Sequence, residues 1–260
     1  MLKEFISISL AALQIAVGSL SNPPVETKTT EIPYIIHAAG EIYGISGTNC
    51  LEAFENAYNK GNRYIELDFS FTEDLKPVCI HDWNYISFPG FEDTRPTYSE
   101  FSKGNVYGSL TPMTLDSVAA FMTSHKDLFI ITDVKDYNIY FAGLLKHNYP
   151  ELCDRFIIQV YSEEQYKYIS QMGFEKIIFS LYRLSPDKML NPDFLVNFAK
   201  ENELFAYTFN AELCEIEGYV EGMLKCEIPL FVHTINDKDA QQRYFDMGIT
   251  GIYTDNTVHK

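Results

Sequence analysis

Short runs of β-branched, aromatic and other apolar residues alternate with helical segments along most of the chain. The runs cover residues 34–38, 64–70, 77–81, 128–134, 155–161, 176–182, 204–209, 230–235 and 251–255. Most are continuously apolar, which is typical of parallel strands covered on both faces. Amphipathic segments, which we expect to be helices, cover residues 49–60, 114–124, 163–172, 193–201 and 237–247. Asn49 and Thr114 are the expected N-caps of the first two.

One pair of runs is too close in sequence for a helical crossover. Six residues separate Ser70 from Pro77, so we expect residues 77–81 to return antiparallel as a hairpin. A centre midway between positions 74 and 75 places Asp68 opposite His81. Setting the return strand aside leaves eight strands, which predicts an α/β fold of the TIM (β/α)8 barrel type. An open doubly wound sheet is the alternative.

Two segments interrupt or precede this pattern. Residues 83–113 are rich in Pro, Gly and Tyr and predict a long loop or small insertion over the barrel mouth. We expect one barrel domain at 33–260 after an N-terminal extension at 1–32. Residues 5–20 carry no charge but are too few to predict stable membrane insertion. Residues 1–20 fit a signal peptide of a secreted or cell-envelope protein, or the first helix of a cytoplasmic one.

The charge balance narrows the class of ligand. The formal net charge is −16, from 20 Lys and Arg against 36 Asp and Glu. This balance argues against nucleic acid and anionic membrane surfaces as partners, because both need clustered basic residues. No strand is followed by a Gly-rich nucleotide-binding loop, and the five Cys form no CxxC pair. We therefore expect a small molecule as the substrate. The sequence does not indicate whether the protein is a monomer or an oligomer.

Three acidic residues lie at strand ends, where TIM barrels carry their active sites. Glu66 and Asp68 are two apart on one strand and therefore face the same side. Asp133 ends the next parallel strand. Such carboxylates repel one another unless a cation compensates them, and they suit one hard divalent cation, Mg²⁺ or Ca²⁺.

Basic residues stand beside these acids. His37 ends the first strand and His81 ends the return strand of the hairpin. Imidazoles titrate near neutral pH, so this pair suits general acid and general base catalysis. Lys135 shares the face of Asp133 and could contact a substrate anion.

Several stretches together resemble the glycerophosphodiester phosphodiesterase family. They are IIHAAG, TNCLEAFENAYNKGNRYIELDFSFTEDLKPVCIHDW, ITDVK, VHTIND and MGITGIYTDN, within about residues 33–256. The resemblance implies an enzyme, a metal-dependent phosphoric diester hydrolase that releases an alcohol and a phosphomonoester, with a cyclic phosphate as an intermediate. By position it implies acid/base roles for His37 and His81, metal ligands at Glu66, Asp68 and Asp133, and a phosphate contact at Lys135.

Three positions depart from the family pattern. Ala38 stands where the family has Arg, Asp133 where it has Glu, and His233 where it has Trp. His233, a Tyr of residues 83–113 and a second metal are the candidates to hold the phosphate in place of the Arg. The Asp133-x-Lys135 pattern also resembles sphingomyelinase D and phospholipase D relatives, which makes cleavage of lysophospholipids one alternative. A barrel that binds phosphodiesters without turnover is the other.

Overall fold

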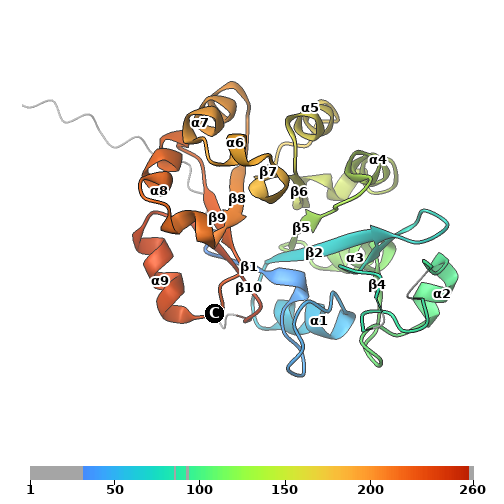
Figure 1. The fold of residues 1–260 in the computed structure, drawn as a ribbon. Coiled ribbons are helices and arrows are strands. Elements are labelled where there is room, and N and C mark those ends of the chain that lie inside the picture. Colours follow the sequence, from blue (N-terminus) through green and yellow to red (C-terminus); the bar gives the residue numbers. More distant parts are fainter. Residues whose placement is uncertain (1–31, 85, 92–93, 258–260) are drawn as a thin grey trace, which may run out of the picture.

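Eight parallel strands close into a barrel in the computed structural model, which describes residues 32–84, 86–91 and 94–257 (Figure 1). The barrel strands are β1 (Tyr34–Ile36), β2 (Tyr64–Phe71), β5 (Phe129–Asp133), β6 (Phe156–Val160), β7 (Ile177–Ser180), β8 (Ala206–Asn210), β9 (Leu230–His233) and β10 (Gly251–Thr254). β1 pairs with both β10 and β2, which closes the sheet. The predicted TIM barrel is therefore confirmed over the open sheet.

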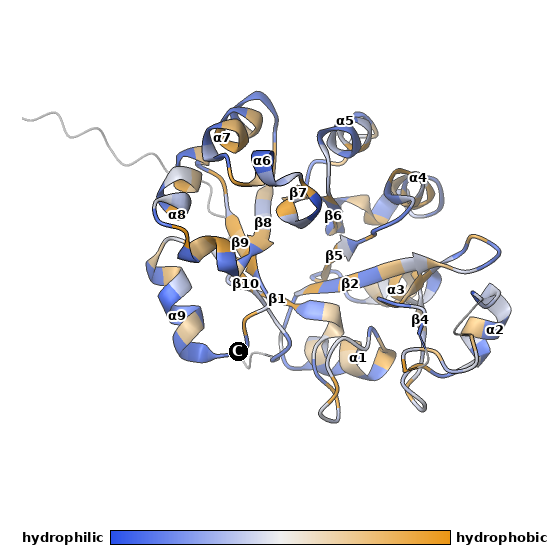
Figure 2. Cartoon of the chain, viewed as in Figure 1, coloured by the Kyte–Doolittle hydropathy of each residue, from blue (hydrophilic) through white to orange (hydrophobic). Residues whose placement is uncertain are grey.

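Helices surround this barrel and fill the connections between its strands (Figure 1). They are α1 (Leu51–Asn59), α2 (Tyr98–Lys103), α3 (Leu115–Ser124), α4 (Asn138–Asn148), α5 (Glu163–Gln171), α6 (Pro186–Met189), α7 (Pro192–Glu201), α8 (Tyr219–Met223) and α9 (Lys238–Asp246). Short 3₁₀ turns occupy His37–Ala39, Pro150–Arg155, Leu181–Arg183, Ala211–Glu215 and Leu224–Cys226. Hydrophobic and hydrophilic residues alternate around the helical turns, as expected of helices with one buried face (Figure 2).

Of the two predicted N-caps, one is confirmed and one is wrong. Thr114 caps α3 and forms a reciprocal capping box with Ser117. Asn49 was the wrong choice for α1, because the Cys50 thiol accepts the hydrogen bond from the Ala53 N–H instead. The side chain of Asn49 turns to the barrel strand β2.

The predicted hairpin forms, but its register differs by one residue from the expectation. β3 (Pro77–Cys79) pairs antiparallel with β2, and β4 (Met113–Thr114) adds to β3. Asp68 faces Ile80 rather than His81, because the Ile80 N–H donates to the Asp68 carbonyl at 3.0 Å. The cause is a turn that ends on Leu75 with φ 55°, the extra left-handed residue typical of odd-length hairpin loops.

The insertion at 83–113 has a small aromatic core in its described part. The Phe88 and Phe101 rings stack with centroids 5.0 Å apart, and Trp83 meets Phe101 edge-on at 5.8 Å. The Trp83 indole N–H donates to Ser70 Oγ on β2 at 2.8 Å. This cluster fixes the insertion beside the C-terminal end of β2.

The barrel interior is apolar at one end and polar at the other. Its closed apolar end is formed by Ile32, Ile35, Ile131, Ile157, Ile178, Ala206, Phe231 and Tyr253. Two positions further along β6, β7 and β8, the same interior face carries Gln159, Ser180 and Thr208. The polar layer therefore lies at the C-terminal ends of the strands, where the candidate residues are.

The expected N-terminal extension lies almost wholly outside the described residues, so the signal-peptide prediction falls outside them too. Ile32, the first described residue, is buried against the barrel strands. Within the described ranges, no helix has the length and apolar character needed to cross a membrane.

Two glycine substitutions test this packing in opposite directions. A Cβ at Gly251 would lie 2.4 Å from the Ile32 carbonyl and 2.6 Å from the Phe231 ring, whereas one at Gly143 in α4 meets nothing within 4 Å. We expect Gly251→Ala to lower the free energy of unfolding by roughly 1–3 kcal/mol, because the added methyl group would overpack the core. Gly143→Ala should raise it by roughly 0.5–1 kcal/mol, because alanine is the better helix former. Urea denaturation measures both free energies of unfolding. If Gly251→Ala were no less stable than Gly143→Ala, the close contact of Gly251 with Ile32 would be contradicted.

Candidate active site

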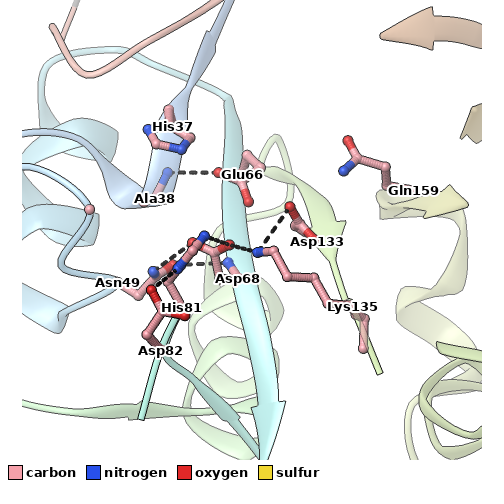
Figure 3. A network of polar contacts seen from close by, with 12 residues as sticks. His37, Ala38, Asn49, Glu66, Asp68, His81, Asp82, Asp133, Lys135 and Gln159 are labelled. Atoms are coloured by element: carbon pink, nitrogen blue, oxygen red, sulfur yellow. Dashed lines mark hydrogen bonds and ion pairs between the residues drawn. The ribbon is translucent and has the colours of Figure 1, made fainter. Parts of the chain in front are cut away.

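Three carboxylates meet at the polar end of the barrel. Glu66 and Asp68 project from the same face of β2, and Asp133 ends β5 beside them (Figure 3). Asp68 and Asp133 are direct partners in the β2–β5 ladder. One oxygen from each of the three side chains lies within 4.8 Å of the other two. The structure thus brings together the three acids that the sequence analysis singled out.

These acids are held against strong mutual repulsion. Burial and the charge of Asp68 raise the pKa of Glu66 to about 8, and the same two causes raise that of Asp133. Burial also disfavours ionised Asp68, but the charges of Lys135 and His81 outweigh it and lower the pKa. Three adjacent carboxylates with oxygen donors fit a hard divalent cation of the Mg²⁺ or Ca²⁺ type. Its positive charge would let all three acids ionise together.

Asn49 orders the central carboxylate of this cluster. Its amide Nδ2 donates to Asp68 Oδ2, and its Oδ1 accepts from the Asp68 N–H, both at 2.9 Å. The residue is fully buried and has φ 51°, a left-handed conformation that Asn tolerates. Sequence reasoning missed this role, since nothing near position 49 indicates a partner in the next strand.

His37 leaves β1 in a tight 3₁₀ turn next to Glu66. Its Nδ1 lies 2.8 Å from Asp255 Oδ1, and Asn236 in turn donates to Asp255 Oδ2 at 2.7 Å. Burial disfavours the imidazolium, but the Asp255 hydrogen bond and the charge of Glu66 outweigh it and raise the pKa of His37 to about 9. Asp255 directly follows β10, so the strand-end rule used for the other acids could have found it.

Ala38 turns its backbone, rather than a side chain, to the acids. Its N–H donates to Glu66 Oε2 at 2.7 Å, and its methyl group is buried. The residue has φ 45°, so the chain bends sharply at this point. At the position of the missing Arg, the structure therefore offers a hydrogen bond to Glu66.

His81 stands on the other side of Asp68. Its Nδ1 lies 2.5 Å from Asp82 Oδ2, and its Nε2 lies 3.9 Å from Asp68 Oδ1. Both histidines therefore have a carboxylate at Nδ1, which favours a proton on that nitrogen and directs Nε2 away from the carboxylate. His37 and His81 also line one cavity of about 240 Å³.

Lys135 lies between two of the acids, on the side away from the histidines (Figure 3). Its Nζ is 3.0 Å from Asp68 Oδ1 and 3.4 Å from Asp133 Oδ2. The buried Tyr161 hydroxyl donates to the other oxygen of Asp133 and accepts from the Val134 N–H at 3.1 Å. Asp133 is thus held from both sides, and Tyr161 joins Asn49 and Asp255 as a site residue that the sequence analysis did not single out.

His233 lies across the barrel axis in a cavity of about 60 Å³ that it shares with Glu66, Asp133 and Ser180. Burial, with a smaller effect of His37, lowers the pKa of His233 to about 4, so the ring is neutral. Within the described residues, His233 Nε2 and Ser180 Oγ are buried without a hydrogen-bond partner. Both atoms are therefore available to a polar group bound beside the acids.

Two isosteric substitutions test how Asn49 acts. Asn49→Asp replaces the amide that donates to Asp68 with a fourth carboxylate. Among the described residues, Asn84 uses only its Oδ1, as acceptor from the Ile86 and Ser87 N–H groups. In the presence of a chelator, we expect Asn49→Asp to lower the free energy of unfolding by roughly 1–3 kcal/mol and Asn84→Asp to leave it nearly unchanged. Equal losses in urea denaturation would show that Asn49 is not a specific clamp.

Comparisons with known proteins show what this chain is similar to. The model of the glycerophosphoryl diester phosphodiesterase family matches residues 40–142. That stretch includes Glu66, Asp68, His81, Asp133 and Lys135, while His37 and His233 lie outside it. A glycerophosphodiester phosphodiesterase of Caldanaerobacter subterraneus subsp. tengcongensis is 23% identical over 224 residues, which cover 80% of this chain and 88% of that protein.

Solved structures share the barrel. A glycerophosphodiester phosphodiesterase from Parabacteroides distasonis superposes with a TM-score of 0.69 at 19% identity, over 87% of this chain and 94% of that one. One from Thermotoga maritima gives 0.67 at 21% identity, over 86% and 94%. A phosphodiesterase from Oleispira antarctica, solved with the product sn-glycerol-3-phosphate, gives 0.68 at 12% identity, over 89% and 96%.

The matched stretch carries most of the site, the Caldanaerobacter relative aligns along most of its length, and the fold is the same. Over residues 40–142 the chain therefore resembles the glycerophosphoryl diester phosphodiesterase family in sequence, and it shares its barrel fold with solved glycerophosphodiester phosphodiesterases.

Proposed function

We propose that this chain hydrolyses glycerophosphodiesters, or diesters with related head groups, to an alcohol and a phosphomonoester. The observation that carries the proposal is the pair of imidazoles, each with a carboxylate at Nδ1, on either side of Asp68. The product bound to the Oleispira relative, sn-glycerol-3-phosphate, is a phosphomonoester of the kind this reaction would release.

His37 and His81 supply the proton transfers in this proposal. One Nε2 accepts the proton of a substrate hydroxyl next to the phosphate, and that oxygen forms a new bond to phosphorus. The other Nε2 gives its proton to the departing alkoxide as the bond from phosphorus to the leaving oxygen breaks. The products of this step are a free alcohol and a cyclic phosphate, and addition of water with the two roles exchanged yields the phosphomonoester.

Glu66, Asp68 and Asp133 are the residues that would hold one divalent cation, Mg²⁺ or Ca²⁺. Once bound, such an ion supplies positive charge that stabilises negative charge on the phosphoryl oxygens. The Lys135 ammonium stands next to the same acids and would contact the phosphate directly. His233 and Ser180, with unpartnered polar atoms in the adjoining cavity, are the proposed contacts on the far side.

Hydrolysis of glycerophosphocholine and glycerophosphoethanolamine with Mg²⁺ or Ca²⁺ tests the activity. We expect alcohol release from the native protein and a fall of at least 100-fold, roughly, for His37→Ala or His81→Ala, because each removes one proton-transfer group. His147→Ala is the matched control, since His147 is exposed on α4 and lies outside the site. Turnover that survives both a chelator and His37→Ala would refute the assignment.

Cation binding is tested without turnover. Titration calorimetry with Mg²⁺ or Ca²⁺ should show weaker binding for Glu66→Gln and Asp133→Asn, each by a factor of roughly 10 or more, since each loses a charged oxygen ligand. Asp136→Asn is the control, because Asp136 is exposed and outside the three-acid cluster although it is a near neighbour in sequence. Equal weakening in all three variants would point to general charge effects instead of a site.

A second candidate function, cleavage of lysophospholipids, is favoured by one observation. Ile86 lines the cavity of the two histidines and is 69% exposed, so an apolar chain could lie over it. Lysophosphatidylcholine in the same assay separates the candidates, since cleavage of it but not of glycerophosphocholine would select this function. Binding of both without turnover, across the metals, would instead identify a non-catalytic barrel.

A further inference from the structure

Two cavities meet at His81, one of the two histidines of the site. Both are lined by Asp68, His81 and Asp82. The first, of about 240 Å³, runs under the insertion past Tyr107, and we call it the Tyr107 cavity. The second, of about 180 Å³, runs along the projecting end of β2 past Arg95, and we call it the Arg95 cavity. A diester has two alcohol arms on one phosphorus, so a phosphate at the junction can send one arm into each cavity.

The two cavities differ in charge. None of the described residues that line the Tyr107 cavity is Lys or Arg. The Arg95 cavity is lined by two cations, Lys135 and Arg95. Lys135 is already engaged by Asp68 and Asp133, but within the described residues Arg95 forms no ion pair. Arg95 is thus a charge-bearing group at the site that the proposed chemistry does not use.

The backbone of β2 anchors Arg95 and sets its distance from the acids. One guanidinium nitrogen, Nη1, donates to the Phe71 carbonyl at 3.1 Å. Phe71 is three positions beyond Asp68 on the strand, which corresponds to about 10 Å. Toward the part of the chain that the structure describes, this is the one hydrogen bond of the guanidinium, so its other N–H groups can meet a carboxylate or phosphate in their fork geometry.

Acidic residues also line the Arg95 cavity. Asp82 and Asp136 are exposed, whereas Arg95 is half-buried, so water screens the two acids more than the guanidinium. These acids can accept hydrogen bonds from an ammonium group on the same alcohol arm. The cavity therefore matches an arm that carries an anionic group and tolerates a cationic one beside it.

We propose that Arg95 selects phosphodiesters in which one alcohol arm carries a further anionic group, a carboxylate or a second phosphate. The guanidinium binds that group in the Arg95 cavity while the diester phosphate lies at the junction with the histidines. This inference rests on the proposed phosphodiesterase activity and specifies its substrate class.

Glycerophosphoserine and glycerophosphoethanolamine form a matched test pair, because they differ by one carboxylate. For the native protein, we expect kcat/KM to be higher for the serine diester by about tenfold or more, the usual effect of a charge-assisted hydrogen bond. Arg95→Gln should remove this preference by lowering kcat/KM for the serine diester while leaving the ethanolamine diester within about twofold. Glycerophosphoinositol with and without a 4-phosphate distinguishes the phosphate source of the anion from the carboxylate source.

Arg243→Gln is the charge-matched control. Arg243 lies on α9, pairs with Glu215 and lines neither cavity, so its loss should leave the substrate ratio unchanged. Arg95→Lys keeps the charge and should retain part of the preference. It also serves as the second variant if Arg95→Gln does not fold.

Each outcome decides the proposal. A serine-to-ethanolamine ratio near one in an active native protein, without discrimination in the inositol pair, overturns it and leaves the phosphodiesterase function intact. Equal losses on both substrates in Arg95→Gln, or an equal change of ratio in Arg243→Gln, also overturn it. Absence of turnover on every diester refutes the proposed function itself, so the two failures are distinguishable.

Discussion

Three neighbouring carboxylates at one end of the barrel repel one another, and the residues around them are arranged to limit this repulsion. Several neighbours of Glu66, Asp68 and Asp133 offer these acids a donor or a positive charge. Ala38 donates its backbone N–H to the first acid, and Asn49 its side-chain amide to the second. A tyrosine hydroxyl and a lysine ammonium hold the third. These groups orient the acids without neutralising all of them, which leaves a site complementary to an added cation.

The barrel makes this concentration of charge tolerable by separating it from the rest of the core. One end of the interior is packed with apolar side chains, and the acids stand at the other, on strands of the same sheet. Because successive inward positions are two residues apart, one strand can contribute to both layers. β2 is longer than the barrel needs and extends into the hairpin. It therefore carries a polar face that runs from Glu66 past Asp68 to Ser70.

Much of this arrangement could be predicted from the sequence, because strand periodicity and strand order are local signals. They were sufficient to predict the barrel and the common face of Glu66 and Asp68. Three features were not predicted from these signals. Asn49 finds its partner 19 residues away, and the hairpin register depends on the conformation of Leu75. α4 was not among the predicted helices, because apolar residues such as Tyr140 and Leu144 also lie off its buried face and blur the pattern.

The contact between His37 and Asp255 joins residues that are 218 positions apart. His37 follows the first barrel strand and Asp255 the last, so the same closure that completes the sheet also completes this pair. During synthesis, the histidine emerges early, and its carboxylate emerges only when nearly the whole chain has been made. A growing or prematurely terminated chain therefore lacks the carboxylate that contacts His37 Nδ1, and this pair can form only in molecules whose last barrel strand has been made.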